Sequence, residues 1–135
     1  MSNIRSRAQL SHFTDVEPLC LACNVNSTSI HMFLQCQTMK SIVNSVLLEL
    51  LNIADIELID VFWGNNIDQK LKRVSHLVFG ACLFTAYNLD KRLKPPNNRA
   101  AKNAAAQLCN LYARTPRGKV YFQGLPNIPI LNLIN

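Results

Sequence analysis

Apolar residues recur at helical spacing along most of the chain, and the clearest early stripe ends near Asn52. Its members follow an i, i+3, i+4, i+7 pattern, which places side chains on one face of an α-helix. They are Met39, Ile42, Val43, Val46, Leu47, Leu50 and Leu51. Residues 27–29 are candidate N-caps for a helix that carries His31 and Cys36, and this helix or a closely following one continues to the end of the stripe.

Asp68 begins the longest predicted helix, which continues to about residue 93. Its apolar face is wide and comprises Leu71, Leu77, Val74, Val78, Ala81, Cys82, Phe84, Thr85, Asn88 and Leu89. His76 is interpreted as a partly buried core residue of this helix. Pro95 and Pro96 then end the helix, because the residue before a proline disfavours the helical conformation.

Two further segments complete the pattern. Residues 53–63 fit either a short strand or one or two helical turns, and we favour a short helix because nothing else in the chain would pair with a strand. Gly64 suits the positive φ of the following turn. A final helix is predicted from residue 97 or 98 to about residue 114. The residues available for its packing are Ala100, Ala101, Ala104, Ala105, Leu108, Leu111 and Tyr112.

These patterns predict an all-α fold, a small helical bundle. The chain has 135 residues, of which 49% are hydrophobic and 16% are charged, so we expect one folded domain rather than a disordered chain. No run of about 18 apolar residues is present, which argues against a transmembrane helix and a membrane partner. The basic N-terminal segment lacks a following apolar region, so no secretory signal is expected and the predicted location is intracellular, either cytoplasmic or nuclear.

The net charge of +6 is divided unevenly, with −3 on residues 1–67 and +9 on residues 68–135. A basic half is typical of contact with a polyanion, but a solvated lysine-rich surface would carry the same charge. The basic side chains of residues 68–135 form three groups: Lys70, Lys72 and Arg73; Lys91, Arg92, Lys94, Arg99 and Lys102; Arg114, Arg117 and Lys119. The middle group spans the corner between two predicted helices, so its five charges could converge on phosphates of RNA or DNA.

One set of residues has the spacing of a metal site: Cys20-x2-Cys23-x7-His31-x4-Cys36. Structural zinc is bound tetrahedrally by cysteine and histidine, and a Cys-x2-Cys pair places two thiolates on one side of the ion. His31 and Cys36 can supply the other two ligands of Zn2+, which leaves no position for a substrate. Buried cysteines beside an ordinary histidine, or a redox-active Cys-x2-Cys pair, are the alternatives.

The remaining cysteines, Cys82 and Cys109, lie in apolar helical stretches and are interpreted as small buried hydrophobic residues. An odd number of cysteines without a secretory signal argues against a disulfide framework. The cysteine usage therefore agrees with a zinc-binding N-terminal knuckle on a helical bundle.

The metal segment resembles the zinc-binding domain at the C-terminal end of reverse transcriptases from non-LTR retrotransposons. The resemblance rests on Leu19-Cys20-Leu-Ala-Cys23 and on His31-Met32-Phe33-Leu34-Gln35-Cys36, and it is specific over roughly residues 18–40. The acidic residue of the family's Glu-Thr is missing here. The resemblance implies a structural zinc ion and a nucleic-acid-binding role beside a polymerase, where the domain helps to position template RNA or target DNA.

The chain contains no polymerase or endonuclease motif and no evident arrangement of catalytic residues, so we expect a non-catalytic fragment or derivative of a reverse transcriptase polyprotein. The predicted parts are a flexible lead-in over residues 1–17, a zinc-binding helical domain over residues 18–114 and an irregular tail over residues 115–135. For Tyr121 and Phe122 in the tail, packing on the helices is favoured over stacking on bases.

Two functions follow from these observations. In the first, a zinc-stabilised helical module binds RNA or DNA within a retroelement machinery. In the second, a zinc-stabilised interaction module docks on the reverse transcriptase polypeptide or another protein and does not contact nucleic acid. The broad apolar face of the long helix motivates the second hypothesis.

Overall fold

The computed structural model describes residue 23 and residues 31–91 and 97–134, and all the regular structure within these residues is helical. The elements are η1 (His31–Gln35), α2 (Gln37–Leu51), α3 (Leu58–Trp63), η2 (Gln69–Leu71), α4 (Lys72–Lys91), α5 (Asn98–Ala113), α6 (Pro116–Gln123) and η3 (Pro129–Asn132). The turn η1 is π-helical, whereas η2 and η3 are 3-10 helices. The all-α prediction is confirmed, and the predicted lead-in over residues 1–17 lies outside the described residues.

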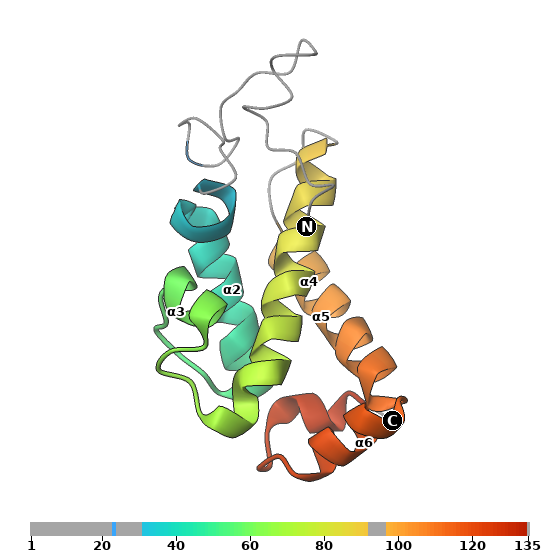
Figure 1. The fold of residues 1–135 in the computed structure, drawn as a ribbon. Helices are drawn as coiled ribbons and strands as arrows, with labels where there is room; N and C mark the ends of the chain where they lie inside the picture. Colours follow the sequence, from blue (N-terminus) through green and yellow to red (C-terminus); the bar gives the residue numbers. More distant parts are fainter. Residues whose placement is uncertain (1–22, 24–30, 92–96, 135) are drawn as a thin grey trace.

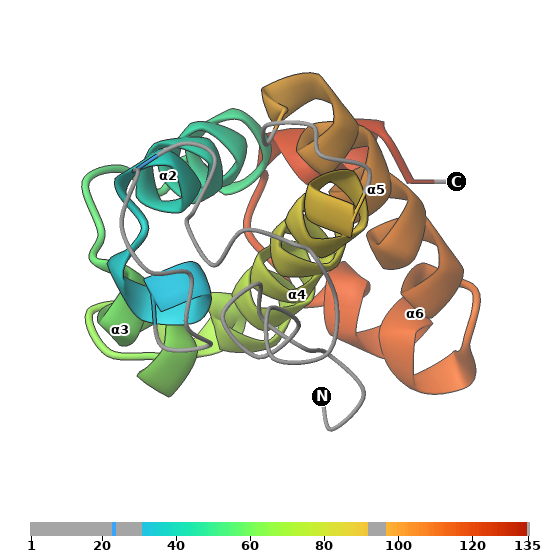
Figure 2. The same ribbon diagram turned by 90° about the horizontal axis from the view of Figure 1, so that it is seen from above.

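The helices form a bundle in which α4 lies between α2 and α5 (Figure 2). The turn η1 and the C-terminal end of α4 lie toward one end of the bundle, and α6 lies at the opposite end, beside the start of α4 (Figure 1). Across the described ranges, none of the helices combines the length and the apolar character that a bilayer crossing requires.

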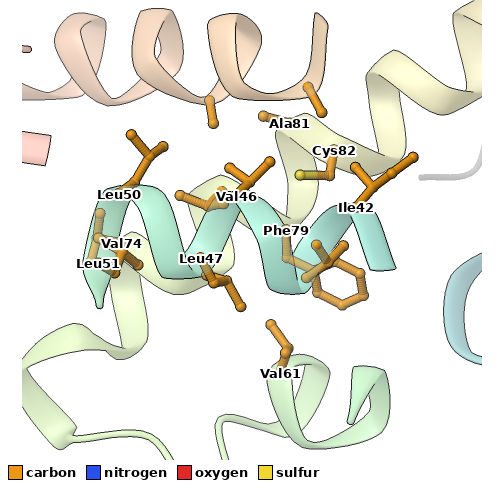
Figure 3. Packing of buried hydrophobic residues seen from close by; sticks show 14 of the residues in the cluster. Ile42, Val46, Leu47, Leu50, Leu51, Val61, Val74, Phe79, Ala81 and Cys82 are labelled. Carbon is orange, nitrogen blue, oxygen red and sulfur yellow. The ribbon is translucent and has the colours of Figure 1, made fainter. Parts of the chain in front are cut away.

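The helix α2 provides the centre of the core. All seven apolar residues that its spacing identified are buried, with exposed fractions of 5% or less. In Figure 3, Val46 points to the side of α2 on which Ala81 of α4 lies, and Leu47 points toward Val61 of α3. Asn52 ends the helix in the left-handed conformation, with φ of 58°. The predicted stripe is therefore confirmed residue by residue.

The connection from α2 to α3 is held by Asn44. The side-chain amide of Asn44 donates to the carbonyl oxygen of Ile56 at 2.8 Å, and its side-chain oxygen accepts from the backbone N–H of Ile56 at 2.8 Å. A short helix follows, as predicted, and ends at Gly64 with φ of 74°. The aliphatic stem of Lys72 packs over this turn, because a Cβ on Gly64 would lie 3.3 Å from Lys72 Cδ.

The helix α4 begins later than predicted. Asp68 does cap a helical turn, since its side chain accepts the backbone N–H of Lys70 at 2.9 Å, but this turn is the 3-10 helix η2. Regular α-helix begins at Lys72. The sequence pattern does not distinguish a 3-10 first turn from an α-helical one, because both place apolar residues three or four positions apart.

One face of α4 is packed, but it is turned around the helix from the predicted face, because Ser75, Phe79, Leu83 and Ala86 are buried although they were not assigned to it. Val74, Val78 and Cys82 are 0 to 1% exposed, in agreement with the spacing. Phe84 is 60% exposed, so its assignment to the packed face is wrong. It follows Cys82 by two residues and so points about 200° around the helix from it. His76 likewise follows the buried Val74 by two residues and points away from the packed face. It is exposed, so its interpretation as a core residue is wrong.

The helix α5 contacts α4 through small residues. Its buried side chains recur every four positions, and they are Ala101, Ala105, Cys109 and Ala113. Small side chains at this spacing allow two helices to approach closely. Leu108 and Leu111 are 37% and 60% exposed, so the prediction that they pack is wrong. The predicted start is confirmed, because the side chain of Asn97 accepts the backbone N–H of Ala100 at 2.9 Å.

The C-terminal segment is mostly helical, so the prediction of an irregular tail is wrong. Pro116 stands in the first turn of α6, and the hydroxyl oxygen of Thr115 before it accepts a backbone N–H as an N-cap. These residues therefore begin a helix within the segment that was predicted to be irregular. Phe122 and Ile130 are buried in the main core, which confirms that this segment packs on the other helices.

Candidate metal centre

The π turn η1 brings His31 and Cys36 to the same side of the chain. The backbone N–H of Cys36 donates to the carbonyl oxygen of His31 at 2.7 Å, which is the i to i+5 bond of a π turn. In a regular α-helix, residues five positions apart point about 140° away from each other around the axis. One continuous α-helix would therefore have separated the two side chains, and α2 begins only after Cys36.

Cys23 joins these two residues in a compact cluster. One ligand atom from each of Cys23, His31 and Cys36 lies within 4.8 Å of the others, and the two sulfur atoms are 3.5 Å apart. A disulfide bond is ~2.0 Å long. Two thiolates bound to one tetrahedral zinc ion at ~2.3 Å stand ~3.8 Å apart. The observed separation suits a shared ion, so this group can hold a metal ion.

The cluster is shielded from solvent and anchored to the core. His31 is 6% exposed and Cys36 is 3% exposed, and Cys23 packs against the main hydrophobic cluster. Burial lowers the pKa of His31 below its usual value, because the charged imidazolium is poorly solvated there. The neutral imidazole is the form that binds a metal. The helix α3 also contacts η1, next to the cluster.

Three of the four predicted ligands are thus brought together, and Cys20 lies outside the described residues. The donor set of two sulfur atoms and one imidazole is soft, which suits zinc and does not suit the oxygen-seeking ions Mg2+ and Ca2+. Within the described part of the chain, the side chains that lie close enough together to hold a metal ion are these two cysteines and this histidine.

The basic residues predicted to contact nucleic acid are only partly described. Arg92 and Lys94 lie outside the described residues, and Lys91 is the last residue of α4. Arg99, in the first turn of α5, is exposed. Lys102 forms an ion pair with Glu49 of α2, with 3.2 Å between Nζ and the carboxylate oxygen. This pair partly neutralises Lys102, so it is less available to a phosphate than the sequence implied.

A basic groove lies between the start of α4 and α6, at the end of the bundle opposite the metal cluster. It was not predicted as a site. It has a volume of about 530 Å³, and it is lined by Gln69, Lys72, Arg73, His76, Leu77 and Tyr121. The cluster Lys70, Lys72 and Arg73 was the signal visible in the sequence. What the sequence did not show is that α6 folds back and places Tyr121 beside these cations.

Comparison of the chain with protein-family models, with curated proteins and with solved structures gives no match. The resemblance to reverse transcriptase zinc-binding domains therefore stays a prediction, carried by the spacing of residues 18–40.

Proposed function

We propose that this protein is a non-catalytic zinc-binding module of the retrotransposon reverse transcriptase type, and that it binds RNA or DNA. The observation that carries the proposal is the convergence of Cys23, His31 and Cys36 within 4.8 Å. Their spacing along the chain is the same spacing on which the resemblance rests. What the structure adds to this spacing is that the three side chains come close enough to share one ion.

In the proposed site, Cys20 is the fourth ligand of Zn2+. Three thiolates and one imidazole fill a tetrahedral shell, so the ion stabilises the fold and does not bind substrate. The residues of η1 and the start of α2 gain most from the ion, because structural zinc contributes folding free energy to the segment that holds it. The donor set favours zinc over the harder divalent ions.

The nucleic-acid role is supported by the basic second half of the chain and by the resemblance. In the proposed interface, Lys91, Arg92, Lys94 and Arg99 contact phosphates near the connection between α4 and α5. Lys102 contributes less because it is paired with Glu49. Contacts of this kind give an affinity that falls steeply with salt and depends little on sequence.

Metal content of the purified protein tests the zinc site. We expect one zinc ion per chain in the wild type and in Cys82→Ala, which removes a buried thiol outside the cluster. Cys23→Ser is expected to lose the ion, because a hydroxyl is a poor ligand for zinc. Equal zinc content in Cys23→Ser and the wild type would contradict the proposed site.

Fluorescence anisotropy with a labelled structured RNA tests the nucleic-acid role. The triple variant Lys91→Ser, Arg92→Ser, Lys94→Ser is compared with Arg114→Ser, Arg117→Ser, Lys119→Ser, which removes the same charge elsewhere. We expect binding by the wild type at about 50 mM salt and a larger loss of affinity in the first variant. Absence of binding by the wild type, or equal losses in both variants, argues against the proposed interface.

The second candidate function is a zinc-stabilised module that docks on another protein. One specific observation favours it: Phe62 and Trp63 at the end of α3 are 50% and 64% exposed, with ring centroids 5.0 Å apart. Ile59 on the same helix is 45% exposed. Exposed aromatic residues are enriched at protein interfaces. If the wild type does not bind RNA although the protein is folded, this second function is favoured.

A further inference from the structure

The basic groove between the start of α4 and α6 combines cations with an apolar wall. Lys72, Arg73 and His76 supply its basic groups, and Leu77 with the ring of Tyr121 supplies its apolar part. None of its six lining residues is acidic. The groove is open to solvent and has a volume of about 530 Å³. It can therefore hold a group larger than a single phosphate ion.

Arg73 is held in place by two aromatic residues. Its Nη1 donates to the hydroxyl oxygen of Tyr112 at 2.8 Å, and its guanidinium carbon lies 5.5 Å from the centroid of the Tyr121 ring. A guanidinium has five N–H donors, and the bond to Tyr112 uses one of them. Among the described residues, no carboxylate forms an ion pair with Arg73. The side chain is thus oriented by the fold, and donors remain for an anion.

Lys72 and Tyr121 are positioned by equally specific contacts. The stem of Lys72 packs over the left-handed turn at Gly64, which restricts the directions in which its ammonium group extends. The hydroxyl of Tyr121 accepts the backbone N–H of Val74 and donates to the carbonyl oxygen of Lys70. Lys72 is therefore positioned by a neighbouring turn, and Tyr121 by backbone groups 47 and 51 positions away in the sequence. Such preorganisation reduces the entropic cost of binding.

We infer that this groove binds one nucleotide unit of a single-stranded nucleic acid. The phosphate lies at Lys72, Arg73 and His76, and the base or sugar lies against Leu77 and Tyr121. Cations beside an aromatic side chain are the combination that single-strand binders use. The choice of a nucleic acid as ligand rests on the proposed function, whereas affinity of the groove for a phosphorylated nucleoside does not.

Titration of the full-length protein with uridine monophosphate, followed by NMR, tests the groove alone. We expect shifts at the His76 and Tyr121 rings with uridine monophosphate, smaller shifts with inorganic phosphate and none with uridine. Shifts confined to basic residues outside the groove, or the absence of shifts, would overturn the inference. Larger shifts with uridine than with uridine monophosphate would also do so, because the phosphate is the group that the cations recognise.

A matched pair of variants tests whether the groove contacts single-stranded RNA. Lys72→Gln and Lys119→Gln each remove one charge from an exposed or half-exposed lysine, but only Lys72 lines the groove. For a short single-stranded RNA at low salt, we expect Lys72→Gln to weaken binding about threefold to tenfold, and Lys119→Gln to weaken it less than about twofold. His76→Gln gives a second variant at an exposed position, with an expected loss of about threefold.

The two proposals fail separately. If uridine monophosphate binds the groove but RNA does not bind the protein, the proposed function fails and the groove remains a nucleotide site. If RNA binds and Lys72→Gln and Lys119→Gln lose affinity equally, the groove is not the contact, and the proposed function stands.

Discussion

The hydroxyl oxygen of Tyr121 accepts a hydrogen bond from the backbone N–H of Val74 at 3.1 Å. The same hydroxyl donates to the carbonyl oxygen of Lys70. These backbone groups are four residues apart, the pair that an uninterrupted α-helix joins directly. Tyr121 therefore bridges the junction at which η2 passes into α4, and it couples α6 to that junction. Burial raises the pKa of Tyr121, so the phenol keeps the proton that it donates.

Tyr121→Phe is expected to lower the free energy of unfolding by about 1–2 kcal/mol, because two backbone groups lose their shared partner. Tyr112→Phe is the control, since the Tyr112 hydroxyl accepts only from the exposed side chain of Arg73. We expect the control to lose less than about 0.5 kcal/mol. Urea unfolding at neutral pH measures both. Equal losses in the two variants would mean that the bridge adds nothing to stability.

The helical pattern was predictable where it depends on local sequence. The buried face of α2 and the Asn97 cap of α5 follow from spacing and capping rules, and both are observed. Phe84 and Leu111 were misplaced because an apolar residue at the edge of a stripe can be covered only if another element lies over it. Which elements cover which edges is decided by the tertiary structure.

The candidate metal site was predictable for a different reason. Its ligands lie within one short segment, so their spacing alone limits the geometry. The π turn was not predictable, although it is the feature that aligns His31 with Cys36. The basic groove was beyond sequence reasoning, because Tyr121 reaches α4 across 47 positions of the chain.

Ser75 carries a hydroxyl that is buried without a hydrogen-bond partner among the described residues, and the residue is 0% exposed. A buried unpaired hydroxyl is destabilising, and alanine favours the helix more than serine does. Ser75→Ala is therefore expected to raise the free energy of unfolding by about 1 kcal/mol.

Ser41→Ala on the exposed face of α2 is the control for that change, since it alters helix propensity alone. We expect an effect of a few tenths of a kcal/mol there. Urea unfolding compares the two variants. Destabilisation by Ser75→Ala would show that this hydroxyl makes a stabilising contact in solution.

The thiols of Cys82 and Cys109 give the protein a specific response to high pH. Burial raises the pKa of each thiol from 9.0 to about 12. Well below pH 9 both thiols are protonated in the folded and unfolded states. Between pH 9 and pH 12 the unfolded chain releases protons that the folded chain keeps, so the free energy of unfolding falls as the pH rises. Each thiol contributes up to about 1.4 kcal/mol per pH unit.

The double variant Cys82→Ala, Cys109→Ala is expected to lose part of its stability at every pH, because it removes buried sulfur atoms. Between about pH 8 and pH 10 its stability should fall less steeply than that of the wild type. Urea unfolding at both pH values gives the comparison. Identical slopes would show that the thiols ionise as readily in the folded protein as in the unfolded chain.

Two glycines in helices provide a test of how α6 packs. A Cβ on Gly118 of α6 would lie 1.8 Å from the backbone carbonyl oxygen of Tyr112, so alanine fits there only if the backbone moves. A Cβ on Gly80 of α4 would meet nothing within 4 Å. The same substitution therefore has opposite expected effects at the two positions.

Gly118→Ala is expected to lower the free energy of unfolding by about 3 kcal/mol, because α6 must move away from the end of α5. Gly80→Ala is expected to raise it by about 0.5–1 kcal/mol, because alanine has less backbone freedom to lose in a helix. Thermal unfolding measures both, and the NMR signal of the Val74 amide reports whether the Tyr121 bond survives. If Gly118→Ala were as stable as Gly80→Ala, α6 would not lie against α5 as the distance requires. Tyr121 would then lack the support that holds it beside Arg73, and the groove would lose its apolar wall.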